Sequence, residues 1–427
     1  MPLHLAGLLR NRDFVMLWAA ETVSTAGSLL GALSLTALLY LDASPAQLGV
    51  LYAAQGLPAL LLTLFAGVWV DRLPRRPVLM LSDVGRAVCL VSVPLAAAFG
   101  LLRMEQVYAV AFLVGGLDVA FRLAYRSYLP SLVDGRALIE GNAKLSASES
   151  IMEVGAPAVG GALVQASGGP AAVLVDAFTF LLSATFLSRI KQSEPRHEPQ
   201  RTASAISEIA EGVSHLWRDR ILRGLAGSNG TLGFFGGFFQ ALYFIFLIET
   251  LHFSPLAAGI TVGAGGIGSL AGAMLAERLV RRLHLGRALL LTRSAHALCA
   301  FLIPLAASSP ELGFAMILFA QLAGDAAWTA HDISAVSLRQ TVVPQRLLGR
   351  VTAGDHVLEY GLLPVGALLG GVLAEVIGIR QALLVAAAGF TCGLGWLIWS
   401  PILGLRVLDA RVLAAGALVP IKPADPS

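Results

Sequence analysis

Four ionisable residues lie inside long apolar stretches in the first half of the chain: Glu21, Asp118, Arg122 and Glu153. Asp118 and Arg122 are four residues apart, so on a helix they share a face and can pair. Burial favours the neutral form of a carboxylate, whereas a neighbouring cation favours the charged form. A carboxylate under both influences can take up and release a proton as its access to water changes. The four residues are therefore a candidate proton-coupling site, with a purely structural ion-pair network as the alternative.

A second group of ionisable residues occupies two apolar stretches near the end of the chain: Asp325, His331, Asp332, Asp355, His356 and Glu359. Asp355 and Glu359 are like charges one helical turn apart, which is unfavourable unless one of them is protonated or paired. His356 titrates near neutral pH and could supply that pairing. The group is a candidate gate or proton exit. Alternatively, these residues lie close enough to the membrane surface to be hydrated.

Aromatic residues crowd the segment 234–246, and Trp328 lies in a later apolar stretch. Phe235, Tyr243 and Trp328 are candidates to contact a lipophilic substrate. Aromatic residues at helical spacing also commonly form a protein core or face lipid, and that remains the alternative for all three.

The sequence offers little support for other chemistry. Residues 263–268 fit the glycine pattern of a dinucleotide-binding loop, but they follow no strand-like segment, so close helix packing explains them better. None of the lysines, Lys144, Lys191 and Lys422, follows a glycine, which excludes the phosphate-binding loop of an ATP-driven pump. The His and Cys spacing predicts no metal site, and no catalytic triad is apparent. We therefore expect neither an enzyme nor a protein with a bound cofactor or metal.

The composition of the chain is that of a membrane protein. Of its 427 residues, 56% are hydrophobic and only 13% are charged, against about 25% charged in soluble domains. The mean hydropathy is +0.75. These values exclude a soluble enzyme, a nucleic-acid-binding protein and a disordered scaffold. The three cysteines all lie in apolar stretches and are too few for a disulfide framework.

Apolar stretches of the length needed to cross a bilayer, about 20 residues, predict twelve membrane-spanning helices. We place them near residues 14–41, 46–70, 78–100, 106–127, 145–167, 170–190, 222–249, 256–277, 287–307, 311–335, 352–376 and 380–402. Of the 30 basic residues, only Arg103 and Arg380 fall in turns on one side of this arrangement. Because basic residues accumulate in cytoplasmic loops, both termini and the central loop should be cytoplasmic. We expect a multi-pass protein of the bacterial inner (plasma) membrane.

The sequence repeats itself after about 210 residues. Three pairs of segments show this: 71–76 with 277–282, 44–45 with 254–255, and 160–161 with 370–371. The repeat predicts two six-helix bundles, residues 1–190 and 221–427. Transporters built from such halves bind substrate between them, near the membrane midplane.

Residues 191–220 form the one long polar segment between the predicted bundles. Within it, Ile206, Ile209, Val213 and Leu216 recur at helical spacing. This pattern predicts an amphipathic helix on the cytoplasmic membrane surface. A plain linker helix fits the pattern equally well.

Two motifs resemble signatures of the major facilitator superfamily. Residues 67–76 (Gly-Val-Trp-Val-Asp-Arg-Leu-Pro-Arg-Arg) resemble the loop between spans 2 and 3 in that family. Residues 155–161 (Gly-Ala-Pro-Ala-Val-Gly-Gly) resemble its span 5 antiporter motif, although the usual Gly-Pro pair reads Ala-Pro here. Further stretches are similar to drug and siderophore exporters related to enterobactin and macrolide efflux proteins: 124–133, 140–144, 337–340 and 346–351. The resemblance covers nearly the whole chain.

The resemblance implies an all-α membrane protein with twelve helices in two pseudo-symmetric halves, and roles for particular residues. The gating loop would comprise Gly67, Asp71, Arg72, Arg75 and Arg76, with Glu277 and Arg278 as its copy in the second half. Asp71 would cap span 11 when the cytoplasmic side is closed. The span 5 motif would comprise Gly155, Pro157, Gly160 and Gly161, which permit bending and close packing.

In exporters of this branch an acidic residue usually stands where this chain has Arg122, so the resemblance implies that Asp118, one turn earlier, replaces it.

These features predict a secondary active transporter: a proton-coupled exporter of lipophilic small molecules, acting by alternating access. The alternatives are an importer of a small organic solute and a non-transporting membrane sensor or accessory protein. We expect a monomer in the lipid bilayer that binds a small-molecule substrate and no nucleic acid. The proton gradient would take the place of a cofactor.

Overall fold

The computed structural model describes residues 8–69, 74–133, 135–191 and 205–405, and all regular secondary structure in these ranges is helical. The N-terminal half contains η1 (Leu8–Arg10), α1 (Arg12–Ser28), α2 (Ala32–Leu41), α3 (Pro45–Trp69), α4 (Arg75–Ala98), α5 (Met104–Leu132), α6 (Gly135–Ser167) and α7 (Gly169–Ser188). After α8 (Ala205–Arg218), the C-terminal half contains α9 (Arg220–Ile245), η3 (Phe246–Thr250), α10 (Pro255–Leu283), α11 (Leu285–Leu302), α12 (Pro310–Val342), α13 (Gln345–Ile377), α14 (Ile379–Ile398) and η4 (Pro401–Gly404).

These helices form the predicted twelve spans. Within the described ranges, nine helical segments are long and apolar enough to cross a bilayer, counting α1 with α2 as one. Helices α3, α6 and α11 take the remaining places in the two bundles. Polar residues lower the hydropathy of two of them: Glu149 and Glu153 in α6, and Arg287 and Arg293 in α11. The protein is therefore an all-helical membrane protein with two six-helix halves.

The first span, predicted as one continuous helix over 14–41, is divided into α1 and α2. The break falls at Leu29–Gly31, where Gly31 has a φ of +64°. Glycine adopts this left-handed conformation without the steric cost that a side chain imposes. Discontinuous membrane helices commonly mark binding sites, because their breaks are tolerated where they line a cavity.

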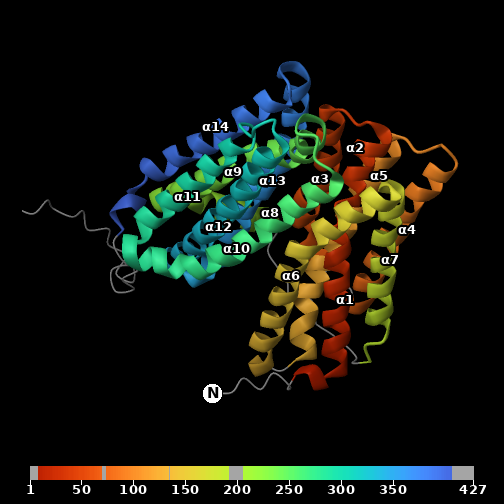
Figure 1. The fold of residues 1–427 in the computed structure, drawn as a ribbon. Coiled ribbons are helices and arrows are strands. Elements are labelled where there is room, and N and C mark those ends of the chain that lie inside the picture. The colour runs from red at the N-terminus through yellow and green to blue at the C-terminus, as the bar shows by residue number, and fades with distance from the viewer. Residues whose placement is uncertain (1–7, 70–73, 134, 192–204, 406–427) are drawn as a thin grey trace, which may run out of the picture.

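The two halves meet at one face of the molecule and diverge toward the other (Figure 1). We call the face that carries the α2–α3, α6–α7, η3–α10 and α13–α14 turns the closed face. The face near the N-terminus we call the open face. Helix α6 packs on α10 and α3 on α13. The α6–α10 contact runs from Gly161 and Pro255 at the closed face to Val154 and Gly266, about half-way along α6.

Four backbone contacts hold the halves together at the closed face, and they form two pairs related by the 210-residue repeat. Gly161 lies against Pro255 and Gly371 against Pro45, while Gly259 lies against Pro157 and Gly49 against Ala367. At each glycine, an added Cβ would overlap a carbonyl oxygen of the other half. Small residues of this kind permit close approach of helices in membranes.

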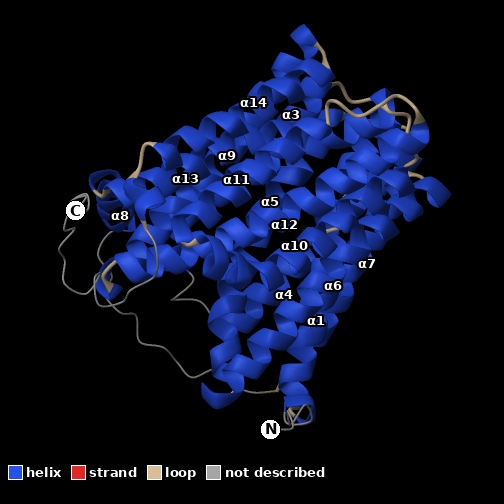
Figure 2. Cartoon of the chain, turned by 60° about the vertical axis from the view of Figure 1, so that its left-hand side comes forward, coloured by secondary structure: helices blue, strands red, loops and turns tan. Residues whose placement is uncertain are grey.

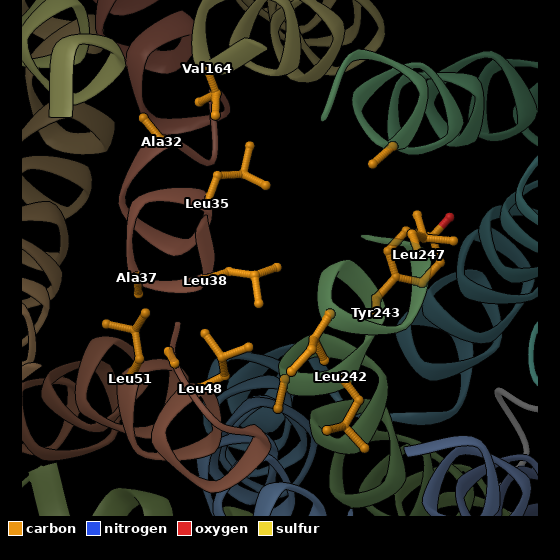
Figure 3. Close-up of a cluster of buried hydrophobic side chains, with 14 of the residues drawn as sticks. Ala32, Leu35, Ala37, Leu38, Leu48, Leu51, Val164, Leu242, Tyr243 and Leu247 are labelled. Carbon is orange, nitrogen blue, oxygen red and sulfur yellow. The ribbon is translucent and has the colours of Figure 1, made fainter. Parts of the chain in front are cut away.

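A buried hydrophobic cluster near the closed face spans both halves. Figure 3 shows Leu35 and Leu38 of α2 with Leu48 of α3 on one side, and Leu242 and Tyr243 of α9 on the other. Further clusters lie inside each half. The shared cluster and the glycine contacts together define which face is closed.

Helix α8 packs on the C-terminal half, close to the start of α13 (Figure 2). Leu216 is buried in a cluster with Leu222 and Val351, and Gly212 lies against the Arg350 carbonyl. The Arg350 side chain pairs with Glu211. This part of the apolar side therefore contacts protein, which favours the linker-helix alternative over a helix lying on the membrane surface. The predicted side chains of Ile206 and Ile209 lie outside those that the structure describes.

Candidate functional site

A cavity of about 480 Å³ lies between the two halves, beside the break in the first span. The N-terminal half contributes Ser28, Leu29, Gly31, Ser34, Tyr52, Gln55 and Pro157. The C-terminal half contributes Phe239, Gln240, Tyr243, Phe244, Val262, His296, Cys299, Ala300, Ile303, Ala320, Gln321, Gly324, Asp325 and Phe390. Because both halves line it, a relative movement of the halves changes its shape and its access to solvent.

Among the described residues that line this central cavity, Asp325 carries the only carboxylate. Its side chain packs against Gly265 of α10, where an added Cβ would overlap a carboxylate oxygen. The His296 ring stacks on Phe390, with 5.2 Å between ring centroids, and its Nδ1 lies 3.0 Å from the Gly324 carbonyl oxygen. The cavity thus offers one acid in a wall of aromatic and small polar groups.

Residues 263–268, which mimic a nucleotide-binding pattern in the sequence, are helix-packing glycines in the structure. Gly265 makes room for Asp325, Gly263 lies against Val154, and Gly268 lies against Leu322. The expected explanation by close packing is confirmed.

A second cavity, of about 200 Å³, lies within the N-terminal half and brings together Glu21, Asp118, Arg122 and Glu153. The expected pair forms: Arg122 Nε donates to Asp118 Oδ2 at 2.7 Å. Arg122 is 64% exposed, so this pair is open to the cavity. One carboxylate oxygen of Glu21, Oε2, is buried without a hydrogen-bond partner among the described residues.

Arg86, which the sequence analysis did not single out, is the centre of the N-terminal network. Its guanidinium pairs with Asp83 and donates to Asp118 at 3.2 Å and to Ser24 Oγ at 3.2 Å. It lies 4.5 Å and 4.2 Å from the ring centroids of Phe121 and Phe180, a cation–π arrangement. Asp83 also accepts a hydrogen bond from Ser183 Oγ at 2.6 Å. Asp83 and Arg86, three residues apart within an apolar stretch, were the signal that could have revealed them.

A buried network in the C-terminal half is built on Asp355. Asp355 pairs with Arg339 and accepts a hydrogen bond from Asn229 Nδ2 at 3.2 Å. Arg293 donates in turn to Asn229 Oδ1 at 2.6 Å. Asp332 and Glu359 lie close enough for their charges to act on Arg293.

The predicted pairing of His356 with Asp355 or Glu359 stays a prediction, and the structure shows an arginine partner for Asp355. The His356 ring stacks on Tyr360, with 5.4 Å between centroids, and Arg339 supplies a positive charge at Asp355. A side chain one position along a helix points about 100° away, so His356 and Asp355 face different surroundings. The sequence analysis did not single out Arg293, Asn229 and Arg339 as site residues.

Of the three predicted substrate aromatics, only Tyr243 lines the central cavity. Phe235 packs against Gly389 of α14, and Trp328 packs on a buried cluster inside the C-terminal half. Their place in the cavity wall is taken by Phe239, Phe244 and Phe390. Phe235 and Phe239 are one turn apart and share a face of α9, but Phe235 packs against Gly389 of α14 and is not among the residues that line the cavity.

The structure describes the predicted gating loop only in part, at Gly67, Arg75 and Arg76. Gly67 lies near the end of α3, and Asp71 and Arg72 fall outside the described residues. Arg75 begins α4, and Arg76 donates to the carbonyls of Leu187 and Ser188 at 3.0 Å and 2.6 Å, which stabilises the end of α7.

In the second copy of the gating loop, Glu277 pairs at 3.5 Å with Arg281, within the exposed last turns of α10, and Arg278 follows Glu277 directly. Glu277 and Arg281 are 80% and 66% exposed. Such exposed pairs contribute little to stability.

The span 5 motif lies at the junction of the halves. Gly160 packs against the Leu30 carbonyl and Gly161 against the Pro255 carbonyl, while Pro157 lines the central cavity. An added Cβ on Gly155 would meet nothing within 4 Å. Three of the four motif residues therefore shape the closed face and the cavity beneath it.

The chain is similar to known proteins over most of its length. A family model described as Major Facilitator Superfamily matches residues 17–354. The multidrug efflux pump Tap of Mycobacterium tuberculosis is 29% identical over 368 residues, which cover 82% of this chain and 84% of the relative. An uncharacterised MFS-type transporter of Bacillus subtilis, YfiS, is 28% identical over 421 residues, covering 95% and 96% of the two chains.

Solved structures share the fold at low sequence identity. A mutant of the nucleoside transporter NupG aligns with a TM-score of 0.75 and 13% identity, covering 90% of this chain and 99% of that one. A bacterial homologue of the iron transporter ferroportin, in an inward-facing state, aligns with a TM-score of 0.72 and 18% identity, covering 92% and 98%.

Proposed function

The chain belongs to the Major Facilitator Superfamily, and from that premise we propose that it exports lipophilic small molecules in exchange for protons across the bacterial plasma membrane. The observation that carries the proposal is the position of Asp325, a single carboxylate in an aromatic-lined cavity that both halves share. Such a site suits a mainly apolar molecule with a polar or positively charged group. The similarity to an efflux pump supports the outward direction.

In this proposal the open face is cytoplasmic, because nearly all of the basic residues that the sequence places in turns belong to the turns of that face. Substrate enters the central cavity from the cytoplasm or the inner leaflet while the closed face blocks release. Rocking of the halves then closes the open face and exposes the cavity to the outside. The protein acts as a monomer, since both halves of the cavity come from one chain.

Proton coupling would lie mainly in the N-terminal network. Arg122 is the exposed partner of Asp118, whereas Arg86 is its buried partner. A proton taken up by Glu21, whose Oε2 is buried without a hydrogen-bond partner among the described residues, would leave the two ion pairs of Asp118 and the pair of Arg86 with Asp83 in place. Protonation would thereby change the charge that the cavity presents without dismantling the buried core of the half.

Efflux of ethidium from energised cells that express the full chain tests the proposal, with and without a protonophore. We expect efflux that stops when the proton gradient collapses and that falls at least about tenfold in Asp325→Asn. Glu311→Gln, on the exposed first turn of α12, serves as the control and should retain efflux. Gradient-driven uptake would indicate an importer, and equal ethidium movement with and without the chain would contradict export of this class of substrate.

A further inference from the structure

Two helices that begin at the closed face receive a side chain from the opposite half at their first turn. At the start of α3, Glu375 of α13 accepts a hydrogen bond from Ser44 Oγ at 2.5 Å and one from the Ala46 N–H at 3.3 Å. At the start of α10, Gln165 of α6 accepts a hydrogen bond from the Leu256 N–H at 3.4 Å. The first N–H groups of a helix have no partner within the helix, so these contacts satisfy donors that otherwise face water.

The two contacts are copies of each other in the internal repeat. Glu375 lies 210 residues after Gln165, and Leu256 lies 210 residues after Ala46. The neighbouring glycine contacts, Gly161 with Pro255 and Gly371 with Pro45, obey the same spacing. The repeat has therefore preserved the position of the acceptor, while one copy carries a carboxylate and the other a carboxamide.

That chemical difference makes the two contacts unequal. The N-terminus of a helix carries a partial positive charge, which a carboxylate stabilises and a neutral amide does not. Hydrogen bonds with an ionised partner are about twice as strong as neutral ones. Glu375 also receives two hydrogen bonds, whereas Gln165 receives one from the backbone.

Both contacts exist only while the closed face is shut. Each one joins a helix of the N-terminal half to a helix of the C-terminal half, at the end of the molecule where the halves meet. Separation of the halves at this face removes the acceptor from the helix terminus. A contact made in one state and lost in the other shifts the balance between them by its own free energy.

We propose that Glu375 and Gln165 are a pair of unequal latches across the closed face, with Glu375 as the stronger. The Glu375 contact then contributes more of the free energy that keeps the closed face shut than the Gln165 contact does. The inference rests on the alternating access of the proposed function, but it concerns the conformational balance and holds for either direction of transport.

Distances across the closed face test this inference without reference to transport. Spin labels at Leu101→Cys and Ser308→Cys would report the separation of the α4–α5 and α11–α12 turns, both exposed at this face. The measurement is pulsed electron paramagnetic resonance on the full chain in lipid nanodiscs, with Cys89, Cys299 and Cys392 replaced by serine. The fraction of molecules at the longer distance gives the open population of this face.

In Glu375→Gln we expect the ratio of open to closed molecules to rise about two- to fivefold, the range expected for one charge at a helix terminus. Gln165→Glu should lower it by a similar factor, and the exchange of both residues should restore a value near that of the parent. Glu375→Ala, which removes the acceptor, should open the face at least as much as Glu375→Gln. Glu311→Gln is the matched control, because it also removes one carboxylate from this face.

The latch is refuted if Glu375→Gln and Glu375→Ala leave the distances as they are in Glu311→Gln, or if Gln165→Glu opens the face. A population shift in a protein that moves no ethidium would uphold the latch and count against the proposed export. Gradient-driven ethidium efflux with no population shift in any latch variant would refute the latch and support the proposed export.

Discussion

Arg86 and Asp118 lie 3.2 Å apart and connect α4 to α5. The arginine side chain is 1% exposed and the aspartate 29% exposed, so this ion pair joins a residue that water does not reach to one at the wall of a cavity. Asp118 has a second partner, Arg122, on the cavity side. The same carboxylate therefore belongs both to the core of the half and to the surface at which ions and substrate would arrive.

Arg86→Leu should strongly destabilise the protein, because it leaves Asp83 buried without a cation. Removing one partner of a buried ion pair costs about 3–5 kcal/mol. Thermal unfolding of the purified protein in detergent measures the loss. Arg122→Leu removes an arginine from the same network at an exposed position and should cost less than about 1 kcal/mol. Equal destabilisation by the two substitutions would show that Arg86 does not organise the half.

Glu21→Gln should abolish the dependence of transport on the proton gradient. One carboxylate oxygen of Glu21 is buried without a hydrogen-bond partner among the described residues, and glutamine cannot take up a proton there. We expect gradient-driven ethidium efflux to fall at least about tenfold while movement down the substrate gradient persists. Glu277→Gln, in an exposed pair on α10, is the control. Unchanged coupling in Glu21→Gln would remove Glu21 from the proton path.

The architecture could be predicted from the sequence because membrane spans and repeats leave simple linear signals. Twelve apolar stretches predict the spans, and the 210-residue spacing between the glycine pairs 160–161 and 370–371 predicts the two halves. Neither prediction needs any knowledge of side-chain contacts. The break at Gly31 was not predicted, because one glycine within an apolar stretch does not reveal its φ. Backbone conformation at a single residue depends on the packing around it.

Pairing within the site could be predicted only along a helix. Asp118 with Arg122 follows from a spacing of four residues, and the structure contains that pair. Asp355 with Arg339 joins two helices, and the local sequence suggested His356 instead. Partners on different helices depend on how those helices are rotated against each other, which the linear pattern does not contain.

Gly161→Ala should shift the protein toward the state in which the closed face is open. Its new Cβ would overlap the Pro255 carbonyl, and overpacking of a tight contact costs about 1–3 kcal/mol. That cost applies only while α6 touches α10, so the open state escapes it. Gly155→Ala on the same helix is the control, because its Cβ would meet nothing within 4 Å. The spin-label distances across the closed face measure both, and identical distributions would contradict the role of the glycine contact.

Asp355→Ala should destabilise the C-terminal half, whereas His356→Ala should not. Without Asp355, Arg339 loses its carboxylate and the Asn229 amide loses an acceptor, although both are buried. A buried cation without its partner costs about 3–5 kcal/mol. His356 is exposed and stacks on a tyrosine that is 50% exposed, so its removal should change stability by less than about 1 kcal/mol. Thermal unfolding of the two variants measures the difference, and equal or greater destabilisation by His356→Ala would contradict the dominant role of Asp355 in this network.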